Sequence, residues 1–233
     1  MKLFPCRIAA VTLLGLSATL CNPAYASGGL SFGASRVVYP ASAQQTTFSV
    51  RNNSTDTTYL MQSWVENADG KKTTDFIITP PLYTSEPGNE NTLRIVSVGA
   101  SHAHHRESLY YLNIKAVPSA DKSAIDKSRA SLMVATVMRI KLFVRPDGLQ
   151  PAREKAADAL ELTRQGGKLN IHNPTPYWLT LTGMKAGDKA LNDVMVPPLA
   201  SASVPLPVGS GSTVTWQSVN DYGGTDNGRS SVH

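Results

Sequence analysis

The sequence predicts an all-β protein built from two domains. Its 233 residues include 17 Gly and 15 Pro, with Thr, Ser and Val scattered throughout the chain, a composition that favours many short strands joined by turns. Runs that are apolar, or that alternate between apolar and polar residues, recur about every 8 to 14 positions with turn-forming residues between them. The length supports two modest hydrophobic cores. These features disfavour a coiled coil, a helical bundle and an array of membrane-spanning helices.

The first 26 residues have the pattern of a secretion signal peptide and are set apart from the domains. A basic start with Lys2 and Arg7 precedes an apolar run over residues 8–20, and the sequence Ala24-Tyr25-Ala26 follows as a cleavage site. The apolar run is too short to span a bilayer comfortably. We therefore expect a mature chain that begins near Ser27 and is exported.

Both cysteines, Cys6 and Cys21, lie in this predicted signal peptide. The mature chain would contain no thiol, so its stability would depend on burial alone. Cys21 would also suit a lipoprotein, but Leu20 stands where a small residue is expected before a lipidated cysteine. Loss of Lys2 and Arg7 lowers the formal charge of +5 by two. A charge this small, in an exported protein, argues against a nucleic-acid partner.

Residues 27–146 form the first predicted domain. Turn clusters at 52–54, 68–70 and 86–88 separate its strands. The predicted strands are Arg36–Tyr39, Thr46–Arg51, Tyr59–Glu66, Phe76–Ile78, Thr92–Val96, Leu109–Val117 and Leu132–Val144. Seven strands in about 115 residues are typical of an immunoglobulin-like sandwich.

A linker and a second domain follow. Pro146 and Gly148 end the longest strand, because proline cannot donate to a strand ladder and glycine permits a sharp turn. Residues 147–158 form a predicted linker, which overlaps the helix-like or linker stretch Gln150–Ala159, and residues 159–233 form a smaller predicted β-domain. Its predicted strands are Leu160–Leu162, Lys168–His172, Tyr177–Leu181, Val194–Val196, Ser203–Leu206 and Thr213–Val219.

The segment Leu132–Val144 is unusual for a strand in a sandwich with one solvent-facing surface. Its first seven residues, apart from Thr136, are apolar at both alternating positions, so both of its faces need cover. The second domain or a loop could supply that cover, or a partner protein could, since an uncovered apolar strand promotes aggregation. The preceding segment Ser119–Ser131 is rich in Lys, Asp, Ser and Ala. We expect a solvated loop that can become ordered when a partner strand is added.

Seven motifs along the mature chain carry a resemblance to a known family. They are Arg36–Pro40, Gln62–Asn67, Ile78–Pro81, Arg106–Asn113, Arg139–Pro146, Asn173–Tyr177 and Asn220–Gly224. Each is weak alone. In this order and behind a signal peptide, they make the chain similar to periplasmic pilus chaperones of the chaperone–usher pathway, in the short-loop group that serves type 1-like fimbriae. The resemblance implies two immunoglobulin-like β-sandwich domains set at an angle, in a boomerang shape.

The resemblance also implies a function. It predicts an ATP-independent periplasmic chaperone that binds pilus subunits by donor-strand complementation, caps them and delivers them to an outer-membrane usher. The partners would be incomplete immunoglobulin-fold pilins, an adhesin and the usher, with no nucleic acid, no cofactor and no ATP. Self-association of free molecules stays open.

By motif, Arg36 and Lys141 correspond to the two cations with which such chaperones bind the C-terminal carboxylate of a subunit. Two cations can fix one carboxylate and so set the register of an added strand. The alternating donor side chains of the last strand correspond to Leu132, Val134 and Thr136.

The third donor position departs from the family, because Thr136 stands where a large apolar residue is often found. Met138 on the same face, or Met133 and Val137 on the other face, could compensate for it.

A charged trio of the family, which bridges the two domains, corresponds to Glu107, Arg145 and Asp221. A carboxylate–arginine–carboxylate cluster at a domain junction can fix the angle between domains even where its net stabilisation is small. We interpret the trio as a geometric device and not as a catalytic pair.

The sequence offers no comparable signal for an enzyme or for a metal site. His102, His104 and His105 superficially suggest metal ligands, but they lie in a predicted solvated loop without a nearby cysteine or carboxylate cluster. The rival hypothesis is an exported enzyme or a carbohydrate-binding β-sandwich. It would need convergent catalytic groups or a polar, aromatic-lined pocket, and the sequence provides neither.

Overall fold

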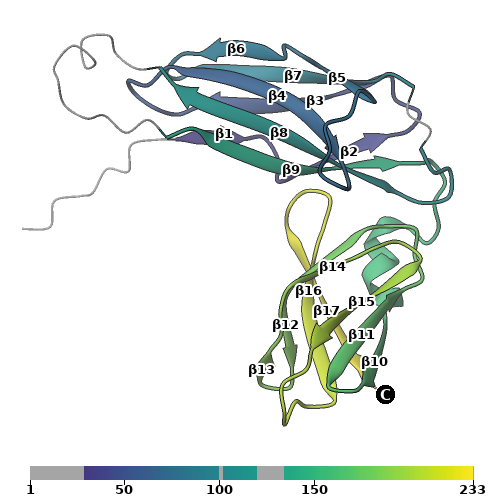
Figure 1. Ribbon diagram of the computed structural model, residues 1–233. Helices are drawn as coiled ribbons and strands as arrows, with labels where there is room; N and C mark the ends of the chain where they lie inside the picture. Colours follow the sequence, from purple (N-terminus) through teal and green to yellow (C-terminus); the bar gives the residue numbers. More distant parts are fainter. Residues whose placement is uncertain (1–28, 100–101, 120–133, 233) are drawn as a thin grey trace, which may run out of the picture.

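The computed structural model describes residues 29–99, 102–119 and 134–232, so the predicted signal peptide lies outside it. The described chain forms two β-domains (Figure 1). The N-terminal domain contains β1 (Leu30–Phe32), β2 (Arg36–Pro40), β3 (Gln45–Asn52), β4 (Tyr59–Asn67), β5 (Phe76–Thr79), β6 (Leu82–Ser85), β7 (Glu90–Ser97), β8 (Ser108–Pro118) and β9 (Thr136–Arg145). The C-terminal part contains the 3-10 helix η2 (Arg153–Ala159), β10 (Glu161–Gln165), β11 (Lys168–Asn173), β12 (Leu179–Ala186), β13 (Lys189–Ala190), β14 (Val194–Val196), β15 (Ala200–Pro205), β16 (Thr213–Val219) and β17 (Thr225–Ser231).

The N-terminal domain is a sandwich of two sheets. One sheet has the strand order β1-β3-β7-β5, and the other has the order β2-β9-β8-β4-β6. The strands alternate between buried and exposed side chains, as in β3, where Phe48 and Val50 point into the core. This period of two matches the pleat of a strand with one buried face. The inward side chains of both sheets form one core that includes Met61, Leu93 and Leu112.

The C-terminal domain is a second sandwich with a separate core. Its sheets have the orders β10-β11-β15 and β13-β12-β16-β17, with β14 paired to β12. Leu169, Ile171 and Leu181 are among the fully buried side chains. Because each domain has its own core, the two can pack as separate units joined at a small junction.

The same side-chain arrangement ends an inner strand in both domains. Asn52 at the end of β3 donates to the carbonyls of Thr57 and Ser85 and accepts from Ser54. Asn173 at the end of β11 donates to the carbonyls of Tyr177 and Pro197 and accepts from Thr175. In each case the buried asparagine amide hydrogen-bonds to groups of the following loop and to one carbonyl of a segment more distant in the sequence. These bonds satisfy backbone groups that are shielded from water.

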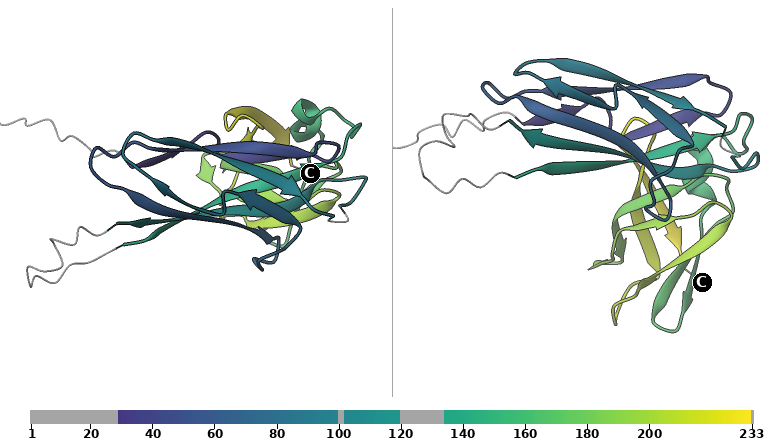
Figure 2. Two further views of the ribbon diagram at one scale, coloured as in Figure 1. Left: turned by 90° about the horizontal axis from the view of Figure 1, so that it is seen from above. Right: turned by 45° about the horizontal axis from the view of Figure 1, so that its top comes forward.

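The two domains lie at an angle to each other, with the β16–β17 hairpin of the C-terminal domain reaching the N-terminal one (Figures 1 and 2). At the junction the backbone N–H of Glu107 donates to the carbonyl of Pro176 at 2.9 Å. The predicted all-β fold with two angled immunoglobulin-like domains is thus confirmed. Among the helices of the described ranges, none combines the length and apolar character needed to cross a bilayer.

Each sequence-based strand overlaps an observed strand, but the sequence did not reveal β1, β6, β13 or β17. β1 and β13 have only three and two residues, and β17 has the polar sequence TDNGRSS, so they lack a hydrophobic alternation. The predicted strand Leu132–Val144 also needs correction. Its observed counterpart β9 begins at Thr136, while Val134 precedes the strand and Leu132 lies outside the described residues.

Candidate functional site

The register between β2 and β9 places Arg36 beside Lys141. These two strands run parallel, and Arg36, the first residue of β2, is the partner of Lys141. Partners in a parallel pair project from the same face of the sheet, and here that face is turned toward the C-terminal domain, because Lys141 contacts Thr180. The two sequence-predicted cations are therefore neighbours at the junction between the domains.

The guanidinium of Arg36 is held in place by the C-terminal domain. Its Nη1 donates to the carbonyl of Val219 at 3.1 Å, and its Cζ lies 5.9 Å from the centre of the Phe143 ring. Arg36 is only 7% exposed, and its Nε has no hydrogen-bond partner among the described residues. Burial, followed by the charge of Arg153, lowers the pKa of Arg36, although Asp221 favours its charged form.

Lys141 is also linked to the C-terminal domain. Its Nζ donates to Oγ1 of Thr180 at 3.0 Å. Burial, and then the charge of Arg36, lowers the pKa of Lys141. Two adjacent, partly desolvated cations are unfavourable without an anion, so a carboxylate that contacts both would relieve the repulsion and be bound strongly. We refer to Arg36 and Lys141 as the cationic pair.

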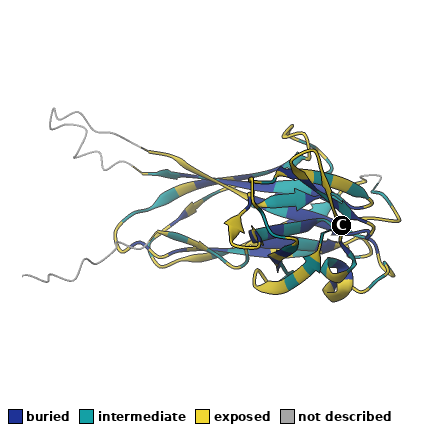
Figure 3. Ribbon diagram, turned by 90° about the horizontal axis from the view of Figure 1, so that it is seen from below, coloured by how far each residue is buried: buried dark blue, intermediate teal, exposed yellow. Residues whose placement is uncertain are grey.

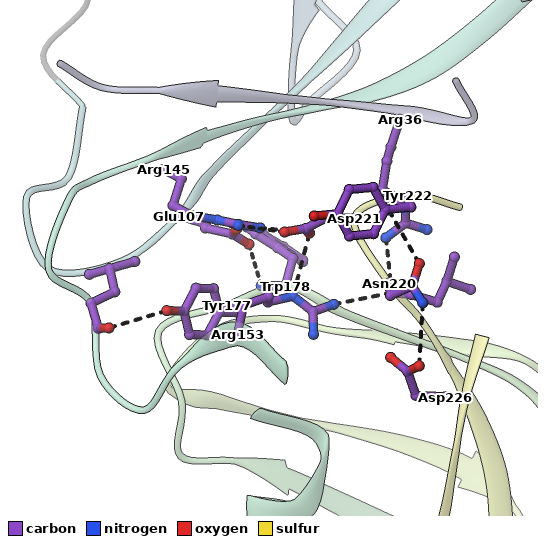
Figure 4. Close-up of polar contacts among 12 residues, drawn as sticks. Arg36, Glu107, Arg145, Arg153, Tyr177, Trp178, Asn220, Asp221, Tyr222 and Asp226 are labelled. Carbon is purple, nitrogen blue, oxygen red and sulfur yellow. Dashed lines mark hydrogen bonds and ion pairs between the residues drawn. The ribbon is translucent and has the colours of Figure 1, made fainter. Parts of the chain in front are cut away.

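The predicted trio of charges comes together at the domain junction (Figure 4). Arg145 donates from Nε to Glu107 at 2.7 Å, and from Nη1 and Nη2 to Asp221 at 2.6 and 2.8 Å. Glu107 is 3% exposed and also accepts from the backbone N–H of Trp178. Removing Arg145 would leave the buried Glu107 carboxylate without its ion-pair partner, which costs about 3 to 5 kcal/mol.

The carboxylates of the trio have different electrostatic environments. Burial opposes ionisation of Asp221, but the hydrogen bonds and charge of Arg145 outweigh it and lower its pKa. Burial raises the pKa of Glu107, against the opposing effects of Arg145 and the Trp178 N–H. Both carboxylates serve as fixed partners of Arg145, with no geometry that suggests proton transfer to a substrate.

Three contributors to this region escaped the sequence analysis. Thr180 holds Lys141, and the carbonyl of Val219 holds Arg36. Arg153, in the predicted linker, donates from Nη2 to the same Val219 carbonyl at 3.1 Å and lies 3.8 Å from Asp221. A backbone carbonyl leaves no signal in residue identity, so the sequence alone could not connect these positions.

The first part of β9 is exposed (Figure 3). Val134 just before the strand is 62% exposed, and Val137 and Met138 within it are 51% and 38% exposed. Thr136 is exposed as well, and with Met138 it lines an apolar hollow of about 270 Å³ beside β1. The described predicted donor positions, Val134 and Thr136, are therefore available to a partner, while Leu132 lies outside the described residues.

One edge of this exposed part is also open. β8 pairs with β9 along one side from Thr136 to Val144. On the other side β2 begins only at the level of Lys141, and no strand among the described residues pairs with Thr136–Ile140 on that edge. Unpaired backbone groups next to apolar side chains form a template for an added strand.

The structure also describes the histidines that superficially suggested a metal site. His104 and His105 are exposed, as expected for a solvated loop. His102 differs from that expectation, because it is half-buried and packs on the rings of Phe76 and Tyr110. Within residues 29–99, 102–119 and 134–232, no group of three or more His, Cys, Asp or Glu side chains is placed to hold a metal ion.

Together, the fold and the charged groups at the domain junction define a protein of two immunoglobulin-like domains. Residues 29–150 match the family described as pili and flagellar-assembly chaperone, PapD N-terminal domain, and residues 155–230 match pili assembly chaperone PapD, C-terminal domain. The chain therefore belongs to the PapD family of pilus-assembly chaperones. Members of this family are assembly factors and not enzymes, and this chain is accordingly no enzyme.

Individual relatives agree with this assignment. The chain is 44% identical over 200 residues to the probable fimbrial chaperone SfmC of Escherichia coli strain K12, covering 86% of each chain. It is also 44% identical over 199 residues to the chaperone protein FimC of the same strain, covering 85% of this chain and 82% of FimC.

Solved structures of similar proteins include the periplasmic chaperone SfaE, with 41% identity and a TM-score of 0.76 over 88% of this chain and 99% of SfaE. A Salmonella enterica complex of the SafA pilin with the SafB chaperone gives 30% identity and a TM-score of 0.79 over 88% of this chain and 96% of the matched chain.

Proposed function

We propose that this protein captures pilus subunits in the periplasm by donating β9 as an additional strand and by binding the subunit's C-terminal carboxylate with the cationic pair. The observation that carries the proposal is the coincidence of two boundaries on β9. The open edge of the strand ends where β2 begins, and Arg36 and Lys141 stand at that point. A strand added to the open edge would therefore end at two cations.

This geometry determines the direction of the added strand. An incoming segment occupies the line of β2 upstream of Arg36, and its C-terminal carboxylate lies at the cationic pair. It must then run toward Arg36 in the same direction as β2, which is parallel to β9. The carboxylate fixes the register, because a slip of one residue would turn every inward side chain to the opposite face.

Side chains at the predicted donor positions supply the second part of the interaction with the subunit. Val134 and Thr136 are exposed in the free protein, and together with Leu132, which lies outside the described residues, they would fill the open core of an incomplete subunit. Burying one exposed large apolar side chain contributes about 1.5 to 3 kcal/mol. A sandwich that lacks one strand would thereby be completed by this chain.

The charged trio would maintain the cleft geometry. Arg145 belongs to β9, whereas Asp221 belongs to the β16–β17 hairpin, so their bidentate pair joins the donor strand to the other domain. A fixed angle between the domains keeps Val219 and Thr180 in contact with the cationic pair. The trio therefore has a positioning role.

The cellular parts of the proposal rest on the predicted signal peptide and on the relatives. SfaE is described as a periplasmic chaperone, and SafB forms a complex with a pilin. We infer export to the periplasm, capture of pilins and an adhesin, and delivery of the captured subunits to an outer-membrane usher without ATP. Free molecules could cover their exposed β9 segments by self-association.

The proposal is tested by affinity purification of the tagged protein from the periplasm of cells that assemble the pilus. A stoichiometric pilin should co-purify and be identified by mass spectrometry, and subunit levels in the periplasm should fall in cells that lack the chaperone. Undiminished subunit levels in the deletion strain would overturn the proposal. Addition of outer-membrane fractions to the purified complex tests delivery, since the complex should bind usher-containing membranes better than usher-free membranes.

A further inference from the structure

Arg153 belongs to neither sandwich, yet it is one of the most buried charged residues of the chain. It lies at the start of η2 between the domains and is 9% exposed. Its Nη2 donates to the carbonyl of Val219 at 3.1 Å, its Nε lies 3.8 Å from Oδ1 of Asp221, and its Cζ lies 5.8 Å from the centre of the Tyr177 ring (Figure 4). Arginine side chains are seldom buried to this extent unless fixed hydrogen-bond or ion-pair partners hold the guanidinium.

The Val219 carbonyl connects Arg153 to the cationic pair. Arg36 and Arg153 each donate to this oxygen at 3.1 Å, so the two donor nitrogens lie within about 6 Å of each other. Within the described part of the chain, this carbonyl is the only hydrogen-bond partner of the Arg36 side chain. The position of the Val219 carbonyl therefore determines where the Arg36 guanidinium lies, and Arg153 helps to hold that carbonyl.

The charges of this region do not balance. Arg36, Arg145 and Arg153 are joined through Val219 and Asp221, and Glu107 and Asp221 are the carboxylates bonded to them, while Lys141 lies beside Arg36. Four cations thus face two carboxylates. Repulsion from Arg153 also contributes, after burial, to the lowered pKa of Arg36. Binding of one more carboxylate would reduce the excess positive charge in a partly desolvated site, where charges interact more strongly than in water.

We propose that Arg153 is a positioning residue for carboxylate recognition: it orients Arg36 through the shared Val219 carbonyl and supplies additional positive potential to the cationic pair. This inference rests on the proposed function, because the ligand is the C-terminal carboxylate of a captured subunit. The alternative is a structural role, in which Arg153 only attaches η2 to the β16–β17 hairpin. A structural role would affect every ligand equally, whereas a positioning role depends on the carboxylate.

The test compares binding of one synthetic peptide, the C-terminal segment of a co-purified pilin, in its free-acid and C-terminally amidated forms. Arg153→Gln should weaken binding of the acid by roughly threefold to thirtyfold and leave binding of the amide unchanged. The dependence of acid binding on salt should also become shallower. Arg164→Gln is the matched control, because Arg164 in β10 likewise donates to loop carbonyls, those of Ser210 and Gly211. It is exposed, and its side chain hydrogen-bonds to no other group in the described ranges.

Two further measurements separate the outcomes. Thermal melting monitors folding, and Arg153→Lys, which retains the charge, should keep an acid preference above that of Arg153→Gln. If the wild-type protein binds acid and amide equally, the cationic pair itself fails as a carboxylate site. If the wild type prefers the acid but Arg153→Gln keeps the full preference, or weakens both peptides equally, the inference about Arg153 alone is overturned.

Discussion

The two ends of β9 have similar apolar side chains but opposite environments. Val137 and Met138 near its start are exposed, whereas Leu142 and Val144 near its end are fully buried. β8 pairs with both parts, so the difference does not come from the sheet on that side. β2 pairs only with the last part, and the C-terminal domain contacts the outer face there at Lys141 and Arg145.

The two faces of this apolar strand are thus covered along only part of its length. The second domain and β2 cover its end, whereas at its start no strand among the described residues pairs with the edge opposite β8, and Val137 and Met138 stay exposed. The inner side chains of the end belong to the N-terminal core. The last part of β9 is paired on both edges and stabilises this protein. We propose that the exposed first part completes the sandwich of a bound subunit.

The largest effect should follow from Leu142→Ala. The Leu142 side chain is fully buried, so its truncation should lower the free energy of unfolding by about 3 to 5 kcal/mol, through lost burial and the cavity left behind. Urea denaturation measures the change. Met138→Ala on the same face should cost less than about 1 kcal/mol, because this side chain is already exposed. Equal losses in the two variants would contradict the division of β9.

Lys141→Ala should separate binding from folding at the border between the two parts. Loss of one cation from a desolvated charge pair costs about 2 to 5 kcal/mol of binding, or about thirtyfold to several thousandfold in subunit affinity. The free protein loses the Thr180 hydrogen bond, which is worth about 1 kcal/mol. A pull-down with the subunit and thermal melting measure the two effects. Lys168→Ala, an exposed substitution in β11, serves as the control, and normal capture by Lys141→Ala would refute the cationic pair.

Thr136→Leu should strengthen the exposed part. A leucine at this donor position would bury more apolar surface in the subunit and should tighten binding by about 1 to 2 kcal/mol, or about fivefold to thirtyfold. Titration calorimetry against the pilin measures the gain. Thr84→Leu on β6, another exposed threonine, should leave the affinity unchanged. An unchanged affinity for Thr136→Leu would show that this position does not enter the subunit.

The smallest effect should be a dependence of binding on pH. Burial and Arg36 lower the pKa of Lys141 from its ordinary value of 10.5, and a bound carboxylate would raise it again. Subunit affinity should therefore be greatest below the lowered pKa and fall as the pH rises through it, by less than the full effect of Lys141→Ala. Fluorescence titrations across the alkaline range measure this, and Lys141→Ala should abolish the dependence. If the pH dependence persists in Lys141→Ala, it comes from the titration of another group.

A change in folding stability caused by titration of Lys141 cannot account for a loss of subunit affinity at high pH. Its pKa is lower in the folded state than in the unfolded state, so the unfolded state binds more protons at pH values between the two pKa values. Stability contributed by this group therefore rises with pH in that range. The expected loss of subunit binding has the opposite sign.

Much of the fold was predictable from local pattern. β14 and β16 begin and end at the residues that the sequence predicts, because alternation and flanking turns specify a strand within a few residues. β17 was missed because its polar sequence forms a strand only by pairing with β16, from Thr213 to Val219. The start of β9 was placed too early, because apolar character alone does not show where pairing with β8 ends.

The site was predictable only where side chains of recognisable charge occupy recognisable motifs. Glu107, Arg145 and Asp221 were grouped by resemblance, and the structure places them in contact. Arg153 stood in a predicted linker with no motif around it. Its contact with Val219 depends on a backbone oxygen, which every residue carries.

The sequence by itself determined most of the strands, the division into two β-domains and the chemical character of the candidate residues, since these follow from periodicity, turn chemistry and charge along short stretches of chain. Only the tertiary structure decided which part of β9 is covered and which cations share a carbonyl. Arg36 and Val219 are 183 positions apart, Arg145 and Asp221 are 76 apart, and Arg153 and Val219 are 66 apart. Contacts over such separations depend on how two independently packed sandwiches meet, and no local pattern encodes that meeting.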